Sequence, residues 1–232
     1  MSKMIKQMAC VAALGASSFA QADVLNFEKS YDSPWLYQGD HIEIGTFWIE
    51  TYNQPAQDGD MVGAIIDGSD SGSCLTGGCP VNNASQYYAG LGDGYMYFGM
   101  NDNSTFRLSS LKASFIGAGQ TSFPAIAGVL VLQGFNANGS LLGGAFQLGL
   151  GGPTGGSFKF NTYDLSPMSD YNYSFVRVLG YGCDPTLGCV RNANLSNFAL
   201  DDITTIPEPG SIALLGLGAL GMAAFTRRRR AV

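Results

Sequence analysis

The chain has 232 residues, which is enough for one domain of ordinary size with a hydrophobic core. Charged residues make up only 13% of the chain and aromatic residues 12%, so the composition excludes a wholly disordered protein. Glycine occurs 32 times, about twice its average frequency, which favours short strands and tight turns over a helical bundle. His41 is the only histidine, which excludes zinc sites built from several imidazoles.

Residues 1–22 have the features of a secretory signal peptide. Two lysines precede a short apolar run over residues 8–16. Ala20 and Ala22 then form an Ala-x-Ala pattern, after which we expect cleavage before Asp23. The sequence therefore predicts export of the chain that follows.

The exported part, residues 23–204, is strongly acidic. Six positive side chains stand against seventeen negative ones, which gives a formal net charge of −11. The six positive residues are Lys29, Arg107, Lys112, Lys159, Arg177 and Arg191. This balance disfavours nucleic acid as a partner, whereas divalent cations and polysaccharides are compatible with it.

Segments in which apolar and polar residues alternate recur along the exported part. They are residues 24–27, 42–49, 95–100, 111–116, 129–135, 173–179 and 198–203. Turns rich in Gly, Asn and Asp separate them, and no segment keeps a capped helical period over three turns. The pattern predicts an all-β domain, a single β-sandwich or jelly roll of antiparallel strands.

Four cysteines lie in the exported part, and a fifth, Cys10, lies in the signal segment. An oxidising compartment favours two local disulfides, Cys74–Cys79 and Cys183–Cys189. A four-cysteine metal site is the alternative, but the spacing of the second pair is longer than the usual zinc spacing.

The exported part has a short motif near each end. The first segment contains Phe27-Glu28, and the last contains Leu200-Asp201-Asp202. These two ends resemble galactose-binding-like jelly rolls of carbohydrate-binding modules. In such modules a Phe-Glu strand lies near a Leu-Asp-Asp strand. The resemblance implies a structural calcium ion with Glu28 and Asp201 as ligands, and the alternative is that these acids are ordinary strand or turn residues.

Other candidate chemistry is sparse. Residues 67–72 have the composition of a calcium loop without the EF-hand spacing, which favours a tight polar loop beside Cys74–Cys79. No Gly-x-Ser-x-Gly elbow accompanies His41, which favours an ordinary strand histidine. Seven aromatic residues are candidates for a sugar-stacking platform, although most of them also fit a core: Trp35, Tyr37, Trp48, Tyr87, Tyr88, Tyr95 and Tyr97.

Residues 205–232 form a tripartite tail. A Pro-Glu-Pro motif precedes an apolar stretch, expected as a transmembrane helix over residues 211–226, and a cluster of arginines follows it. The defining residues are Pro207, Glu208, Pro209, Gly210, Arg227, Arg228, Arg229 and Arg230. The uninterrupted apolar run is shorter than the ~20 residues of a full span, but arginines that snorkel extend it and fix the C-terminus in the cytoplasm.

This tail resembles the PEP-CTERM sorting signal. The resemblance implies that an exosortase in the inner membrane of a Gram-negative bacterium recognises and processes the chain. The segment Phe198-x-x-Asp201 also resembles a PEP-CTERM subfamily with a Gln-Phe-x-x-Asp motif, although Asn197 stands in place of the glutamine.

Together these features predict a non-catalytic exported protein. We expect a membrane-anchored precursor and then a role at the cell surface or in the exopolysaccharide or biofilm matrix. The alternative is a carbohydrate-binding jelly-roll module with structural calcium. A secreted glycosidase is a third possibility, for which the sequence has no specific motif.

Overall fold

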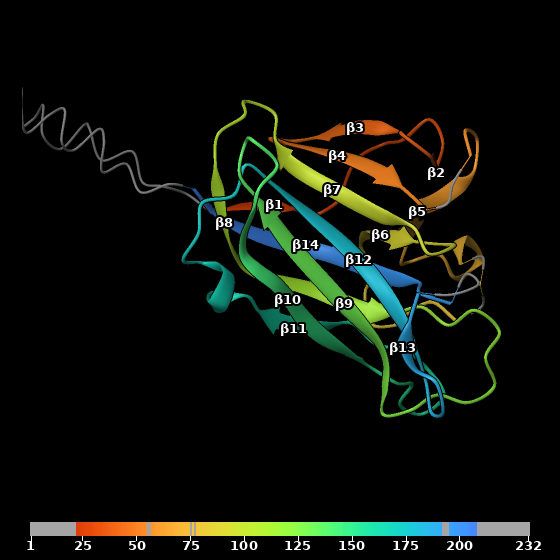
Figure 1. Ribbon diagram of the computed structural model, residues 1–232. Helices are drawn as coiled ribbons and strands as arrows, with labels where there is room; N and C mark the ends of the chain where they lie inside the picture. Colours follow the sequence, from red (N-terminus) through yellow and green to blue (C-terminus); the bar gives the residue numbers. More distant parts are fainter. Residues whose placement is uncertain (1–21, 55–56, 75, 77, 192–194, 208–232) are drawn as a thin grey trace, which may run out of the picture. The chain divides into compact units, whose positions relative to one another are not determined.

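A computed structural model describes residues 22–54, 57–74, 76, 78–191 and 195–207, and of Pro207 the backbone only. Residues Asp23–Ile206 form one compact unit made of two antiparallel sheets (Figure 1). The predicted all-β sandwich is therefore confirmed. The expected boundary between residues 204 and 205 falls inside the last strand, which continues to Pro207.

The first sheet has the strand order β11-β8-β14-β6-β5-β2, with β1 paired to β14. Its strands are β1 (Asp23–Leu25), β2 (Trp35–Tyr37), β5 (Met61–Asp67), β6 (Gln86–Gly90), β8 (Phe106–Phe115), β11 (Asn161–Asp164) and β14 (Phe198–Pro207). Two short 3-10 helices, Ser71–Ser73 and Ser166–Met168, lie in the connections.

The second sheet has the strand order β10-β9-β12-β7-β4-β3, with β13 paired to β12. Its strands are β3 (His41–Ile44), β4 (Phe47–Tyr52), β7 (Tyr95–Met100), β9 (Ile126–Phe135), β10 (Leu141–Gly151), β12 (Phe175–Asp184) and β13 (Gly188–Val190). In Figure 1, β12 and β9 cross in front of β14, which belongs to the other sheet.

Residues 42–49 were expected to form one strand, and this expectation is wrong. The chain turns at Gly45 and Thr46, and β3 pairs with β4 as a hairpin in which Ile44 lies opposite Phe47. Gly45 has a φ of +59°, a left-handed conformation that glycine adopts readily. Gly45 and Thr46 are both exposed between buried Ile44 and Phe47, so the alternation shifts by one residue at the turn, and the prediction wrongly included this shift in one strand.

The sequence pattern also missed several strands, because their side chains do not alternate. In β5, all five residues from Val62 to Ile66 are buried, so the strand has no polar face. In β10, four of the eleven residues are glycines, and the pairing with β9 is irregular between Leu142 and Ala145. Such strands lack the period-two signal on which the prediction depended.

The main core lies between the two sheets and is rich in large aromatic side chains. Phe47 and Phe98 come from the second sheet, and Phe106, Phe115 and Phe198 come from the first. Each of these side chains is at most 1% exposed. Burial of apolar area contributes about 25 cal/mol per Å², so these residues are a major source of stability.

Among the described residues, no helix is long and apolar enough to cross a membrane. The predicted signal segment up to residue 21 and the predicted helix 211–226 lie outside the described residues.

Glycine in the core strand β9 makes room for a buried ring. A Cβ atom at Gly134 would lie 2.1 Å from ring carbons of Tyr173, which is 1% exposed. We therefore expect Gly134→Ala to lower the free energy of unfolding of residues 23–206 by about 1–3 kcal/mol, because the ring must move. Urea unfolding measures the change.

The matched control is Gly151→Ala. Gly151 lies at the end of β10, and a Cβ atom there has no neighbour within 4 Å. Equal stability changes for the two variants would contradict the packing argument.

Candidate functional site

Every second residue of the β10-β9-β12-β7-β4-β3 sheet points away from the core. Phe47 and Ile49 are buried in the core between the sheets, so Trp48 and Glu50 between them face outward. We call this outward surface the aromatic face. It comprises Trp48, Tyr52, Tyr95, Tyr97, Phe135, Phe175 and Tyr181, together with the polar residues His41, Glu50, Gln133 and Arg177.

Trp48 lies against the sheet over a glycine. It is paired across the strands with Gly99, and a Cβ atom at Gly99 would lie 2.6 Å from the indole ring. The ring of His41 stacks on Trp48, with centroids 6.1 Å apart and an angle of 17° between the planes. The half-buried indole thus lies over the Gly99 backbone, with the exposed imidazole of His41 as a neighbour.

Three tyrosines from β4 and β7 pack together beside Trp48. The ring of Tyr52 lies 5.9 Å from those of both Tyr95 and Tyr97, measured between centroids. The Tyr52 hydroxyl donates to Glu50 Oε2 at 2.9 Å, and burial together with this carboxylate raises the pKa of Tyr52 to about 12. His41 Nδ1 lies 3.1 Å from Glu50 Oε1, so both carboxylate oxygens have partners.

The face also carries a stacked phenylalanine pair and a guanidinium group. Phe135 and Phe175 lie directly opposite each other in the sheet, with ring centroids 5.1 Å apart and planes at 14°. Arg177 Nε donates to Gln133 Oε1 at 2.9 Å, and its guanidinium carbon lies 5.9 Å from the centroids of Tyr95 and Phe135. These contacts fix the guanidinium on the sheet surface.

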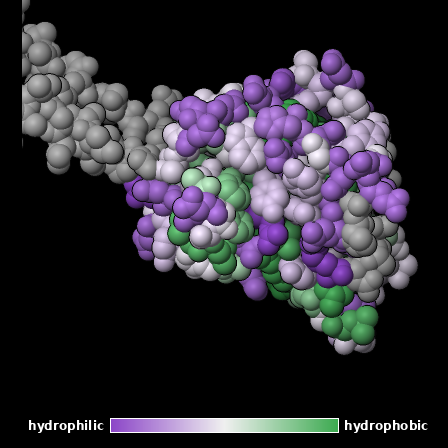
Figure 2. Space-filling view, turned by 45° about the horizontal axis from the view of Figure 1, so that its top comes forward, coloured by the Kyte–Doolittle hydropathy of each residue, from purple (hydrophilic) through white to green (hydrophobic). Residues whose placement is uncertain are grey.

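A groove of about 350 Å³ adjoins these residues. It is lined by Val129, Val131, Gln133, Ala145, Gln147, Tyr181 and Cys189. Cys189 belongs to β13 and is paired by a disulfide with Cys183 of β12. The disulfide thus ties β13 to β12 at one side of the groove. Figure 2 shows a surface in which purple and pale residues predominate and green apolar residues form only separate patches.

Of the seven predicted platform residues, the structure brings Trp48, Tyr95 and Tyr97 to the outward side of this sheet, where neighbouring side chains leave Tyr95 only 8% exposed. Tyr87 and Tyr88 are buried on β6, and Trp35 and Tyr37 lie on β2 of the other sheet; these four are not part of it. The prediction missed Tyr52, Phe135, Phe175 and Tyr181. The strand register determines which of these aromatic residues share a face, and short sequence patterns do not reveal the register.

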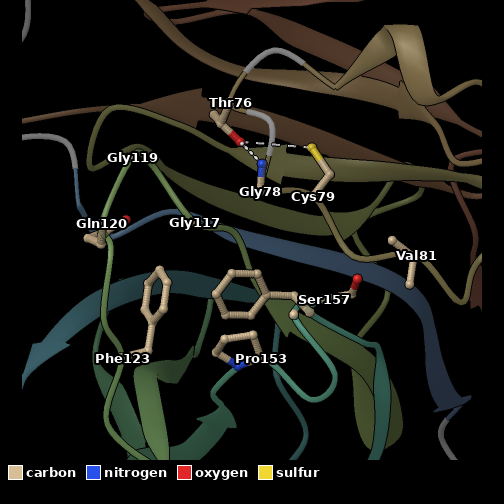
Figure 3. A pocket seen from close by; sticks show the side chains of 12 residues that line it. Thr76, Gly78, Cys79, Val81, Gly117, Gly119, Gln120, Phe123, Pro153 and Ser157 are labelled. Carbon is tan, nitrogen blue, oxygen red and sulfur yellow. Dashed lines mark hydrogen bonds between the residues drawn. The ribbon is translucent and has the colours of Figure 1, made fainter.

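A second cleft, of about 290 Å³, lies beside the disulfide Cys74–Cys79 (Figure 3). Phe123, Phe158 and Pro153 form its apolar part. The Thr76 hydroxyl accepts a hydrogen bond from the Gly78 N–H. None of the described lining residues is a free titratable group, so the cleft offers no acid or base for catalysis.

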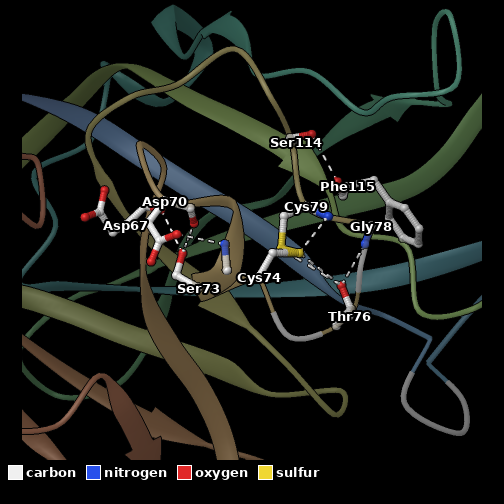
Figure 4. Close-up of a disulfide and its surroundings, with 10 residues drawn as sticks. Asp67, Asp70, Ser73, Cys74, Thr76, Gly78, Cys79, Ser114 and Phe115 are labelled. Carbon is white, nitrogen blue, oxygen red and sulfur yellow. Dashed lines mark hydrogen bonds between the residues drawn. A yellow bond between two sulfur atoms is a disulfide. The ribbon is translucent and has the colours of Figure 1, made fainter.

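Residues 67–72 form a tight polar loop, as the composition favoured. Asp67 Oδ1 accepts hydrogen bonds from both the backbone N–H and the hydroxyl of Ser69, and these bonds lower the pKa of Asp67. Asp70 accepts from the Gly72 N–H in the same way. Figure 4 shows Asp67 and Asp70 beside the disulfide Cys74–Cys79, whose pairing agrees with the prediction.

Glu28 and Asp201, the predicted calcium ligands, bind to neighbouring residues of one segment. Glu28 Oε1 accepts from the Gln86 N–H at 2.8 Å, and Asp201 Oδ2 accepts from Ser85 Oγ and Asn83 Nδ2, each at 2.8 Å. The side chain of Asp201 is fully buried, and desolvation raises its pKa. Hydrogen-bond donors surround the carboxylate, which therefore already has partners without a metal ion.

Among the described residues, Glu28 and Asp201 have no further acidic or imidazole side chain close enough to complete a metal site. No three His, Cys, Asp or Glu side chains within the described ranges lie close enough to hold a metal ion. Calcium takes about six to eight oxygen ligands, so backbone or amide oxygens would have to supply most of them. The calcium site stays a prediction.

We expect Asp201→Ala to lower the free energy of unfolding by about 1–3 kcal/mol, because the partly buried donors of Asn83 and Ser85 lose their acceptor. Thermal unfolding of residues 23–206 measures this loss. If calcium binds, excess Ca²⁺ raises the melting temperature relative to EDTA, and Asp201→Ala removes that difference.

Equal melting in Ca²⁺ and EDTA would reject the calcium site, and an unchanged stability of Asp201→Ala would contradict the hydrogen-bond argument. Asp184→Ala is the control, because Asp184 is an exposed acid whose acceptor bonds are confined to its own turn.

Comparison with solved structures finds proteins of similar fold. A DUF4465 family protein from Bacteroides caccae has 13% identity and a TM-score of 0.54, covering 81% of this chain and 100% of that chain. A DUF4465 family protein from Bacteroides ovatus has 11% identity and a TM-score of 0.41, covering 81% and 99%. The family 11 carbohydrate-binding module of a Clostridium thermocellum cellulosomal cellulase has 12% identity and a TM-score of 0.33, covering 82% and 96%.

The first likeness shows the fold alone, and the other two carry no argument about function. Comparison with curated protein sequences finds no match. A match to a known family is found at residues 205–230, which fit the PEP-CTERM protein-sorting motif. The residues that carry the predicted motif lie in this range, and all of them except Pro207 are outside the described residues. The chain is therefore a protein with a PEP-CTERM sorting domain that follows a β-sandwich.

Proposed function

We propose that the protein is an exported, non-catalytic component of the cell surface or of an extracellular polysaccharide matrix. The PEP-CTERM motif at residues 205–230 is the observation that carries this proposal, because such motifs imply export, membrane anchoring and exosortase processing. The predicted signal peptide at residues 1–22 supports the same route. In this proposal the inner membrane holds the precursor through residues 211–226 until the exosortase acts.

A second proposal concerns the β-sandwich itself, which we infer binds polysaccharide through the aromatic face. Aromatic rings that lie along a sheet offer flat apolar surfaces to sugar rings, and hydrogen-bonding side chains beside them can bind hydroxyl groups. Trp48, held over Gly99, is the observation that favours this role. On the same face, Glu50 has both oxygens in hydrogen bonds, which favours binding over acid or base catalysis.

Processing at the tail is tested on protein isolated from producing cells, with and without the exosortase. We expect mass spectrometry to place the mature C-terminus near Pro207-Glu208-Pro209 only when the exosortase is present. Replacing Arg227, Arg228, Arg229 and Arg230 by serine should impair membrane retention or cleavage, because the positive charges set the topology.

Replacing the same four arginines by lysine is the control, since it keeps the charge. A chain that ends at Val232 in both strains would disprove exosortase sorting for this protein.

Binding to polysaccharide is tested by affinity electrophoresis in gels that contain xylan, β-glucan, alginate or polygalacturonate. We expect retardation in at least one gel and about a tenfold loss of affinity for Trp48→Ala, because the stacking surface is removed. Tyr37→Ala is the control, because Tyr37 is 40% exposed but lies on β2 of the other sheet. Retardation in none of the gels, or an equal loss for both variants, would reject the aromatic face as a binding site.

A further inference from the structure

Arg177 lies in the middle of the aromatic face with much of its hydrogen-bonding capacity unused. The strand register places it between Tyr97 of β7 and Gln133 of β9. Its Nε and Nη2 both donate to Gln133 Oε1. A guanidinium group has five N–H donors, so three of them have no acceptor among the described residues. Arg177 is only partly buried, so a ligand can reach it.

Arg191 brings a second positive charge to the same place. Its guanidinium carbon lies 5.4 Å from the centroid of Tyr95, on which Arg177 also rests at 5.9 Å. Arg191 Nη2 donates to the main-chain oxygen of Asp93, and its Nε is buried without a partner among the described residues. Two of the six cations of a strongly acidic domain thus converge on one ring.

No carboxylate among the described residues neutralises Arg177. Lys112 Nζ lies 2.6 Å from Asp202 Oδ2, and His41 lies beside Glu50, with which it forms an ion pair only when its ring is protonated; neither pair includes Arg177. The charge of Lys112 is therefore paired with Asp202 on the first sheet, whereas the side chain of Arg177 points outward from the second sheet.

Across the strands, Arg177 pairs with Tyr97, and Tyr97 pairs with Glu50, which is the acidic side chain in this line of paired residues. Glu50 lies on β4, two strands from β12, which corresponds to about 10 Å at the usual strand spacing. This distance is about one Debye length at 0.1 M salt, whereas a ligand carboxylate on Arg177 would lie at hydrogen-bond distance. A ligand carboxylate bound to Arg177 is therefore attracted by Arg177 more strongly than it is repelled by Glu50.

We propose that the aromatic face binds an acidic polysaccharide, with the carboxylate of a uronic acid residue held by Arg177. The proposal rests on the polysaccharide binding proposed above. The free N–H groups match the planar, two-oxygen geometry of a carboxylate, which arginine binds better than lysine does. The ring of the sugar then lies against Tyr97, the neighbour of Arg177 across the strands, and Arg191 adds a second attractive charge.

The decisive experiment compares two forms of one polymer, polygalacturonate and the same polymer after reduction of its carboxyl groups to alcohols. The full-length protein, purified in detergent, is titrated with oligomers of each by calorimetry. We expect roughly ten- to hundredfold tighter binding of the acidic form, because charge-assisted hydrogen bonds are lost on reduction. We also expect the preference to decrease as NaCl rises. This comparison needs no substitution in the protein.

Arg177→Gln should remove the preference for the acidic form while binding of the reduced form is retained. Lys159→Gln is the matched control, because it removes the same charge from an exposed position outside the aromatic face. A thermal melt of each variant checks folding.

Equal affinity for both forms, with Trp48→Ala still weakening both, would overturn the acidic specificity and leave polysaccharide binding intact. Equal loss of preference in Arg177→Gln and Lys159→Gln would also overturn the proposal, because net charge alone would then explain it. Binding of neither form, together with no retardation in any of the polysaccharide gels, would reject both proposals.

Discussion

The register between β4, β7, β12 and β9 is the constraint on which both the core and the aromatic face depend. Because successive side chains alternate between the two sides of a sheet, the pairing that buries Phe98 also turns Tyr97 outward. A shift of one residue would place Arg177 in the core and expose Val178. The apolar side chains of the core therefore specify the positions of the functional candidates on the opposite surface.

Glycines let large rings lie close to the backbone on both sides of this sheet. Gly134 accommodates the buried ring of Tyr173, and Gly99 accommodates the indole of Trp48 on the outward side. In the core, this close approach fills space that a void would otherwise occupy at a cost in stability. On the aromatic face, it holds an indole along the strands, in a position suited to contact with a flat ligand.

The charged residues of the domain are unevenly distributed. The domain as a whole is acidic, which opposes non-specific association with polyanions. On the aromatic face, however, the guanidinium groups of Arg177 and Arg191 both lie against the ring of Tyr95. The disulfide between Cys183 and Cys189 closes the β12–β13 hairpin, and Arg191 directly follows β13. An oxidising compartment, which the sorting motif implies, is also the one in which this disulfide is stable.

Features that depend on short stretches of chain were predictable from the sequence by itself. The sorting motif is contiguous, and each disulfide closes a loop so short that its partner is the next cysteine along the chain. Alternation identified the all-β class, because many short strands without a helical layer bury their apolar sides against another sheet, and the two-sheet arrangement meets that need. The tertiary structure alone decided which aromatic residues share a surface, why Tyr88 lies in the core while Tyr97 faces outward, and why Arg177 meets Gln133. These choices follow from pairing between strands that are distant in the sequence, and the periodicity within one segment contains no information about such pairing.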